Sequence, residues 1–99
     1  MAFNMQKMLQ EAKSMQQKLN KKIAEFDKEE FEYVYKKTIS IKIKGNLEIL
    51  KIDIDKNLVD PEDKTMLEEM IAEAINEAIE SISEEKDKIT KSMMPSMPF

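Results

Sequence analysis

The amino-acid sequence predicts an α+β fold made of a long N-terminal helix, a three-stranded antiparallel sheet and a C-terminal helix. Apolar residues recur at steps of three and four over residues 4–28 and again over residues 61–91, which is the spacing of an amphipathic helix. Between them, residues 31–54 are rich in β-branched and aromatic side chains and partly alternate in polarity, as half-buried strands do. We expect one domain over residues 1–92 and a flexible tail, rich in proline and methionine, over residues 93–99.

The first predicted helix carries an apolar seam that is close to a heptad repeat. Neither Gly nor Pro interrupts it, and Lys22 occupies the one position where the seam lapses. A helix of this length extends about 36 Å at ~1.5 Å per residue, whereas a short strand extends about 20 Å. We therefore expect one end of the seam to extend beyond the sheet and contact another subunit. The seam residues are Met5, Met8, Ala12, Met15, Leu19 and Phe26, flanked by Leu9 and Ile23.

The strand segment divides at a glycine. Gly45 and Asn46 form the predicted turn of a hairpin, because Gly and Asn suit tight turns. The return strand, LEILKIDID, changes phase half-way along its apolar residues. A β-bulge near Ile49 and Leu50 would bring both halves onto one face. The apolar face of the strand before the turn consists of Ile39, Ile41 and Ile43.

The second predicted helix has a clear start signal and an unbroken apolar stripe. Asp60 is a suitable N-cap residue, and Pro61 suits the first helical position. Glutamates line the opposite side of the helix, where we expect a solvated face. The stripe consists of Leu67, Met70, Ile71, Ala74, Ile75, Ala78, Ile79 and Ile82.

The composition argues against catalysis. The 99 residues include no His, Cys, Trp or Arg, so the usual general base and the commonest metal ligand are both missing. Asp53 and Asp55 share a strand face and could suggest a cation site, but Mg²⁺ and Ca²⁺ need more convergent oxygens. We therefore favour a solvated strand end over a cation site for this pair. We expect no enzyme, no catalytic residue, no metal, no cofactor and no small-molecule substrate.

Hydropathy also argues against a membrane partner. No apolar run approaches the ~20 residues of a membrane-spanning helix, and the N-terminal segment is amphipathic without the apolar core of a signal peptide. We therefore expect a cytoplasmic protein.

Charge is distributed unevenly along the chain. The net charge is −4, with 16 lysines and 20 acidic residues, yet the first helix is basic. Its lysines could be a solvated face or a ridge that binds phosphates without reading sequence. Glu11 and Glu25 lie on the same ridge, at i, i+4 spacing from Lys7 and Lys21, and this favours the solvated face on composition alone. The lysines are Lys7, Lys13, Lys18, Lys21 and Lys22, with Lys42 and Lys44 on the polar face of the hairpin.

The chain resembles the YbaB/EbfC family of bacterial nucleoid-associated proteins over nearly its full length. The order and spacing of several short motifs carry the resemblance. The strongest is DKTMLEEMIAEAINEAI, residues 63–79, which includes Asn76-Glu77-Ala78. The others are Phe3-Asn4-Met5, Lys7-Met8, Met15-Gln16, Ile52-Asp53-Ile54-Asp55 with Leu58, and Met97-Pro98-Phe99.

The resemblance implies a homodimer that binds double-stranded DNA, organises the nucleoid and affects gene expression, without enzymatic activity. Sheets and second helices would form the joined body, and the first helices would project as two arms. On this basis the DNA-binding residues would be the seven lysines named above, acting mainly on phosphates. The dimer interface would be formed by Leu67, Met70, Ile71, Ala74, Ile75 and Ala78.

Two features depart from the family pattern. The glycine-rich segment usual before the second strand is replaced by YVYKKTIS. The absence of arginine argues against base-specific contacts, because bidentate recognition of guanine most often uses arginine.

A prefoldin-like holdase or a protein–protein adaptor is the alternative function. Helix, hairpins, helix is also the element order of prefoldin-like chaperones, and a methionine-rich helix could hold apolar segments. The second helix argues against it, because its stripe has a period near 3.6 residues and suits a globular interface better than a coiled coil.

Overall fold

The computed structural model describes residues 4–93 and confirms the predicted element order. Residues 1–3 and the expected tail lie outside the described residues, except for Met93, which ends the second helix. Two short 3₁₀ turns, η1 and η2, join the last strand to that helix. The elements are α1 (Met5–Lys28), β1 (Glu30–Tyr35), β2 (Ile39–Lys44), β3 (Ile49–Ile54), η1 (Lys56–Leu58), η2 (Pro61–Asp63) and α2 (Lys64–Met93).

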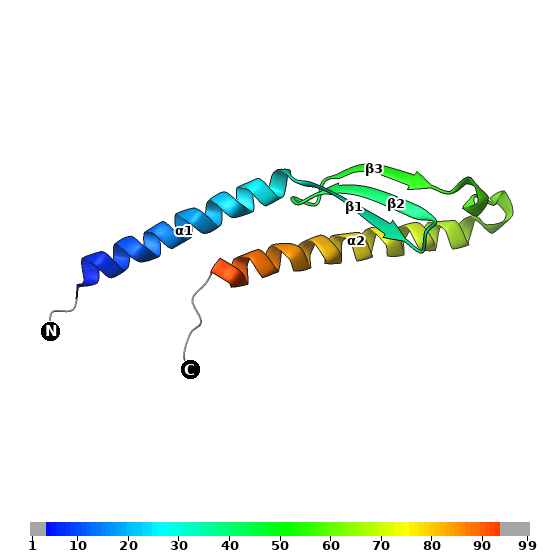
Figure 1. Ribbon diagram of the computed structural model, residues 1–99. Coiled ribbons are helices and arrows are strands. Elements are labelled where there is room, and N and C mark those ends of the chain that lie inside the picture. Colours follow the sequence, from blue (N-terminus) through cyan, green and yellow to red (C-terminus); the bar gives the residue numbers. More distant parts are fainter. Residues whose placement is uncertain (1–3, 94–99) are drawn as a thin grey trace, which may run out of the picture.

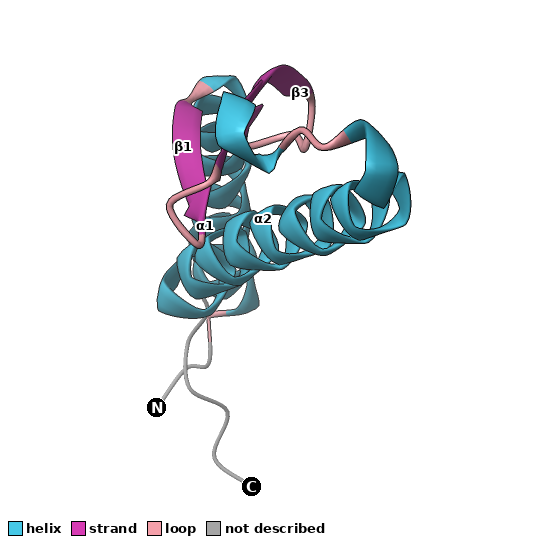
Figure 2. Cartoon of the chain, turned by 90° about the vertical axis from the view of Figure 1, so that its right-hand side faces the viewer, coloured by secondary structure: helices cyan, strands magenta, loops and turns pink. Residues whose placement is uncertain are grey.

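The molecule is elongated, with principal extents of 76 × 28 × 16 Å. Its sheet has the antiparallel order β1-β2-β3 and lies on one side of α2 (Figures 1 and 2). Past the sheet, α2 runs beside α1 in the opposite direction, and α1 continues beyond the end of α2 (Figure 1). One end of α1 therefore projects from the body of the chain.

The predicted seam of α1 is buried at one end only. Asn4 caps the helix, since its Oδ1 accepts a hydrogen bond from the backbone N–H of Lys7 at 3.0 Å. Towards the other end, Phe26 is buried and Ile23 is half-buried. The N-terminal seam residues are exposed, so the expectation that the seam extends beyond the sheet is confirmed; its contact with another subunit remains a prediction.

The sheet matches its predicted alternation and its predicted bulge. Ile39, Ile41 and Ile43 are almost fully buried. Lys42 pairs with Lys51, but the next residue of β2 pairs with Ile49. Leu50 is therefore the extra residue of a β-bulge, which brings Ile49 and the later isoleucines of β3 onto one face.

α2 begins three residues later than its sequence signals predict. Asp60 does act as a cap, but its side chain accepts a hydrogen bond from Glu62 N–H and begins the 3₁₀ turn η2. The α-helix follows from Lys64 and ends at Met93. Its core side is formed by Ala74, Ala78 and Ile82, and the two alanines let the helix axis approach the isoleucines of β2.

Candidate nucleic-acid interface

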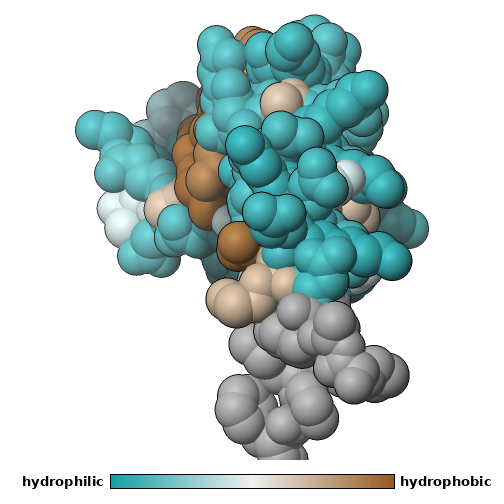
Figure 3. Space-filling view, turned by 90° about the vertical axis from the view of Figure 1, so that its left-hand side faces the viewer, coloured by the Kyte–Doolittle hydropathy of each residue, from teal (hydrophilic) through white to brown (hydrophobic). Residues whose placement is uncertain are grey.

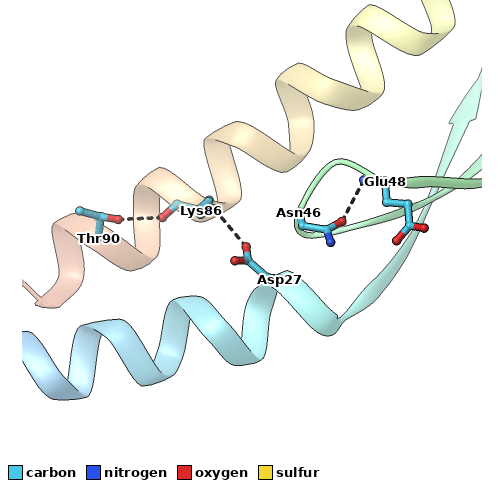
Figure 4. A network of polar contacts seen from close by, with 5 residues as sticks. All are labelled: Asp27, Asn46, Glu48, Lys86 and Thr90. Atoms are coloured by element: carbon cyan, nitrogen blue, oxygen red, sulfur yellow. Dashed lines mark hydrogen bonds and ion pairs between the residues drawn. The ribbon is translucent and has the colours of Figure 1, made fainter.

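Four lysines of α1 project on the side of that helix that faces away from α2. The α2 side is marked by Asp27, whose Oδ1 lies 3.0 Å from Nζ of Lys86 (Figure 4). At about 100° per residue, Lys18 lies about 180° round the helix from Asp27, and Lys7 about 200°. Lys21 lies about 60° from the direction of Lys18. Lys22 lies about 40° from it and also about 40° from the buried Phe26, so it stands at the edge of this side, next to the seam. We call these four residues, which are all exposed, the lysine ridge.

Lys13 stands apart from this ridge. It lies only about 40° round the helix from Asp27, so it projects towards the side on which α2 runs. The structure thus groups four of the five α1 lysines that were predicted to bind DNA on one surface and places the fifth on another.

Among the described residues, the ridge lysines form no direct ion pair with the glutamates on the same side of α1. Within residues 4–93, no ion pair joins Lys7 to Glu11 or Lys21 to Glu25, which corrects the i, i+4 pairs expected from the spacing. Such surface pairs gain at most about 1 kcal/mol and cost side-chain entropy, so spacing permits them without requiring them. The ammonium groups of the ridge therefore have no direct carboxylate partner, although Glu11 and Glu25 lie on the same side of the helix.

The lysines of α2 show the opposite arrangement. Three of them each form an ion pair with a carboxylate three or four residues away, at 3.0–3.5 Å. Their charge is offset locally, on a helix that carries more acidic residues than lysines. These pairs are Lys64–Glu68, Lys88–Glu85 and Lys91–Asp87.

The hairpin lysines lie in a surface of mixed sign. Lys42 is exposed on the outer face of the sheet, and its register partners are Glu32 on β1 and Lys51 on β3. A shallow hollow of about 170 Å³ on this face also includes Asp53. Lys44 forms an ion pair with Glu48 at 3.7 Å. Sequence reasoning missed Lys51, although the predicted bulge is what places it opposite Lys42.

Part of the apolar face of the sheet is uncovered. Ile52 pairs with Ile41, so both side chains lie on the face that α2 packs against. Ile41 is fully buried, whereas Ile52 is 37% exposed, as is Ile49. α2 therefore covers β2 but leaves β3 open, and Figure 3 shows a band of hydrophobic surface between hydrophilic side chains.

Two tyrosines define which flank of α2 faces β1. The hydroxyl of Tyr33 donates to Oε1 of Glu77 at 3.3 Å, and that of Tyr35 donates to Oε2 of Glu73. Burial is the main cause that raises the pKa of Tyr33; the hydrogen bond to Glu73 is the main cause that raises the pKa of Tyr35. Ile75 lies about 200° round the helix from both glutamates, so it faces the open side near β3.

The residues predicted for a dimer interface have different exposures. Ala74 and Ala78 are 0% exposed within one chain, because they pack against its own sheet, and they offer no surface to a second copy. The other four are half-buried. Sequence reasoning missed the isoleucines of β3, since it could not show which strand α2 leaves uncovered. The four are Leu67, Met70, Ile71 and Ile75.

The described chain contains no arrangement typical of metal chemistry. Nowhere within residues 4–93 do three metal-ligating side chains gather closely enough to hold an ion. Asp55 instead caps η1, where its Oδ1 accepts a hydrogen bond from Asn57 N–H at 3.0 Å. Neither helix combines the length and apolarity that crossing a bilayer requires.

The fold and surfaces define a small α+β protein with a projecting basic helix and an apolar face that one chain leaves incomplete. The chain belongs to the YbaB/EbfC DNA-binding family, whose model matches residues 1–97. It is 71% identical over 93 residues to a nucleoid-associated protein of Malacoplasma penetrans, covering 94% of this chain and 99% of that protein. Nucleoid-associated proteins of Ureaplasma urealyticum and Ureaplasma parvum are 45% and 44% identical over 93 residues, each covering 94% of both chains.

Proposed function

We propose that this protein is a homodimeric nucleoid-associated protein that binds duplex DNA mainly through phosphate contacts. The observation that carries the proposal is the lysine ridge, four exposed and unpaired lysines on an otherwise acidic chain. The relatives named as nucleoid-associated proteins support a location at the nucleoid in the cytoplasm. The description of the family names DNA binding. We propose that the protein acts by binding and not as an enzyme.

The shape of the ridge suits a nucleic-acid backbone. Lys7 and Lys22 are about 22 Å apart along the helix at ~1.5 Å per residue, a length over which duplex DNA presents several phosphates. Lysine binds phosphate as a point charge, so the contacts carry little sequence information. Binding along many sequences would organise the nucleoid and thereby affect gene expression.

The other predicted lysines have secondary roles in this proposal. Lys42 and Lys51 lie on the outer face of the sheet, which like the ridge faces away from α2, and could extend the contact. Lys44 is held by Glu48, and Lys13 lies on the other side of α1, so each would contribute less. The acidic surface of α2 would repel the duplex and orient the protein with its ridge towards it.

A second copy of the chain is the partner that we propose for the open face of β3. Ile49 and Ile52 are exposed on the face of the sheet that α2 packs against, and Ile75 of α2 is half-buried. Burying apolar area gains about 25 cal/mol per Å². Two copies joined there would double the number of ridge lysines. Leu67, Met70 and Ile71, on the same helix, would border the contact.

Salt-dependent DNA binding tests the proposed function. The triple variant Lys18→Gln, Lys21→Gln, Lys22→Gln removes three ridge charges and should weaken binding to all duplexes alike. If about six phosphates are neutralised, log K for the unmodified protein should fall against log salt with a slope of about −5. Fluorescence anisotropy at several salt concentrations measures both quantities.

A matched control separates the ridge from net charge. The variant Lys64→Gln, Lys88→Gln, Lys91→Gln makes the same charge change on α2, where each lysine is paired. Its affinity should fall far less than that of the ridge variant. Equal losses, or an unchanged affinity in the ridge variant, would show that α1 is not the DNA site.

The exposed methionines of α1 favour a holdase as the second candidate function. Met5 and Met8 are 62% and 54% exposed, and methionine adapts to irregular apolar partners. Suppression of aggregation of an unfolded client, without salt-sensitive DNA binding, would support this function instead.

A further inference from the structure

The exposed end of the α1 seam forms one continuous apolar surface. Its large residues are 37–65% exposed, and four of its members line an apolar hollow of about 250 Å³. The same seam continues along the helix into the half-buried Leu19 and the buried Phe26, so the two parts face one direction. We call the exposed part the arm stripe, which consists of Met5, Met8, Leu9, Ala12 and Met15.

The cover over this seam ends where α2 ends. The two helices run antiparallel (Figure 1), and the ion pair between Asp27 and Lys86 fixes which residues lie level. Met93 is seven residues beyond Lys86, and the residue of α1 seven positions before Asp27 is Asn20. α2 therefore stops roughly level with Asn20, and the arm stripe begins just beyond it.

The residues that follow α2 have the composition and length to continue this cover. The segment MPSMPF, residues 94–99, has no charged residue in a chain that is 36% charged. Pro95 and Pro98 prevent it from extending the helix and favour an extended backbone of about 3.1 Å per residue. Six such residues reach about 19 Å, or roughly twelve residues of a neighbouring helix. From the level of Asn20 that distance ends near Met8.

We propose that residues 94–99 pack along the arm stripe of their own chain, with Met94, Met97 and Phe99 against its methionines. The segment would shield the stripe from water and hold α1 at a fixed angle to α2. The lysine ridge lies on another side of the helix, so it stays accessible. This packing would take the place of the contact with another subunit that the sequence alone predicts for this end of the seam. The proposal does not depend on DNA binding, since it concerns only the apolar side of α1.

Disulfide trapping tests this contact. The chain has no native cysteine, so only the two introduced thiols can form a disulfide within one chain. The double variant Met8→Cys, Phe99→Cys places one thiol on the arm stripe and one at the end of the segment that would lie level with it. The control Gln10→Cys, Phe99→Cys moves the first thiol about 200° round the helix at nearly the same level. Under a mild oxidant, the Met8 variant should close a disulfide within one chain roughly tenfold faster than the control.

Two results would overturn the proposal. Equal rates in the two variants would mean that the segment has no preference for the arm stripe. Cross-linked dimers without cross-linked single chains, read from mass under denaturing conditions, would assign the stripe to a second copy.

Hydrogen exchange gives an independent measurement without cysteine. The variant Met94→Ser, Met97→Ser, Phe99→Ser should increase amide exchange over residues 5–16 and leave residues 19–28 unchanged, because α2 still covers those. Unchanged exchange over residues 5–16 would contradict the proposed packing.

Discussion

Gly45 lies so close to Phe26 that a Cβ atom on the glycine would be 2.0 Å from the carbonyl oxygen of the phenylalanine. The Gly45 N–H also donates a hydrogen bond to the carbonyl of Glu29 at 3.0 Å. The ring of Phe26 packs beside that of Phe31, with centroids 5.1 Å apart. The one glycine of the chain therefore joins the end of α1 to the β2–β3 turn, and so helps to set the direction in which the basic helix projects.

Replacing this glycine should destabilise the fold. In Gly45→Ala the added methyl group would clash with backbone rather than with a mobile side chain, so α1 or the turn must move. We expect a loss of about 1–3 kcal/mol in the free energy of unfolding, measured by urea denaturation followed by circular dichroism. The control Asn46→Ala removes only an exposed hydrogen bond to Glu48 N–H and should cost less. Equal losses in the two variants would contradict the close approach.

The β1–β2 turn holds two lysines in a conformation that glycine adopts more easily. Lys36 and Lys37 have φ values of 45° and 58°, and a non-glycine residue in that region is strained by roughly 1–2 kcal/mol. Lys37→Gly should raise the free energy of unfolding by about 1 kcal/mol, seen as a higher urea midpoint. Lys37→Ala keeps the strain and should give no such gain. If Lys37→Gly and Lys37→Ala raise the urea midpoint equally, the gain comes from loss of the lysine charge and not from relief of backbone strain.

The strands could be predicted closely because their signals are local. Strict alternation placed Ile39, Ile41 and Ile43 on one buried face, since successive strand residues point to opposite sides. The phase change of the return strand required an extra residue, and the bulge lies at Leu50. Both features depend only on the sequence of the strands themselves.

The surfaces proposed to carry function depend on tertiary contacts and could not be predicted in the same way. Sequence alternation treats Ile52 like Ile41, yet α2 covers only one of them. The i, i+4 spacing of Lys7 and Glu11 permits an ion pair, but its small gain does not force one. Charge alone likewise suits a solvated helix face as well as a DNA site, and membership of the family favours the second.

The hydrogen bond between Tyr35 and Glu73 predicts a loss of stability in alkaline solution. This bond raises the pKa of Tyr35 above its ordinary value near 10, so the folded state holds the hydroxyl proton more tightly than the unfolded state does. The resulting stability is fully present below the unfolded pKa and is lost as pH rises through the folded pKa. Tyr35→Phe removes this contribution. The difference in free energy of unfolding between the two proteins should therefore shrink as pH rises above about 10, and a constant difference would contradict the assignment.

The open face of β3 predicts which substitution should separate two copies of the chain. Ile52 is already 37% exposed in one chain, so Ile52→Glu should leave the single chain folded. A charge placed in an apolar contact without a partner is costly to bury. If the unmodified protein has the mass of two chains, as we propose, the variant should have the mass of one. Light scattering after gel filtration measures this mass, and circular dichroism reports whether the chain is folded.

Val34→Glu provides the matched control for this substitution. Val34 is an apolar residue on the other edge strand, β1, and is 52% exposed. It pairs with Ser40 on the outer face of the sheet, away from α2, so a glutamate there should not disturb the contact through β3. A dimer that survives Ile52→Glu, or one that Val34→Glu disrupts equally, would move the interface away from the open face of β3. If Ile52→Glu dissociates the dimer and Val34→Glu does not, the contact lies on the apolar surface that α2 leaves uncovered.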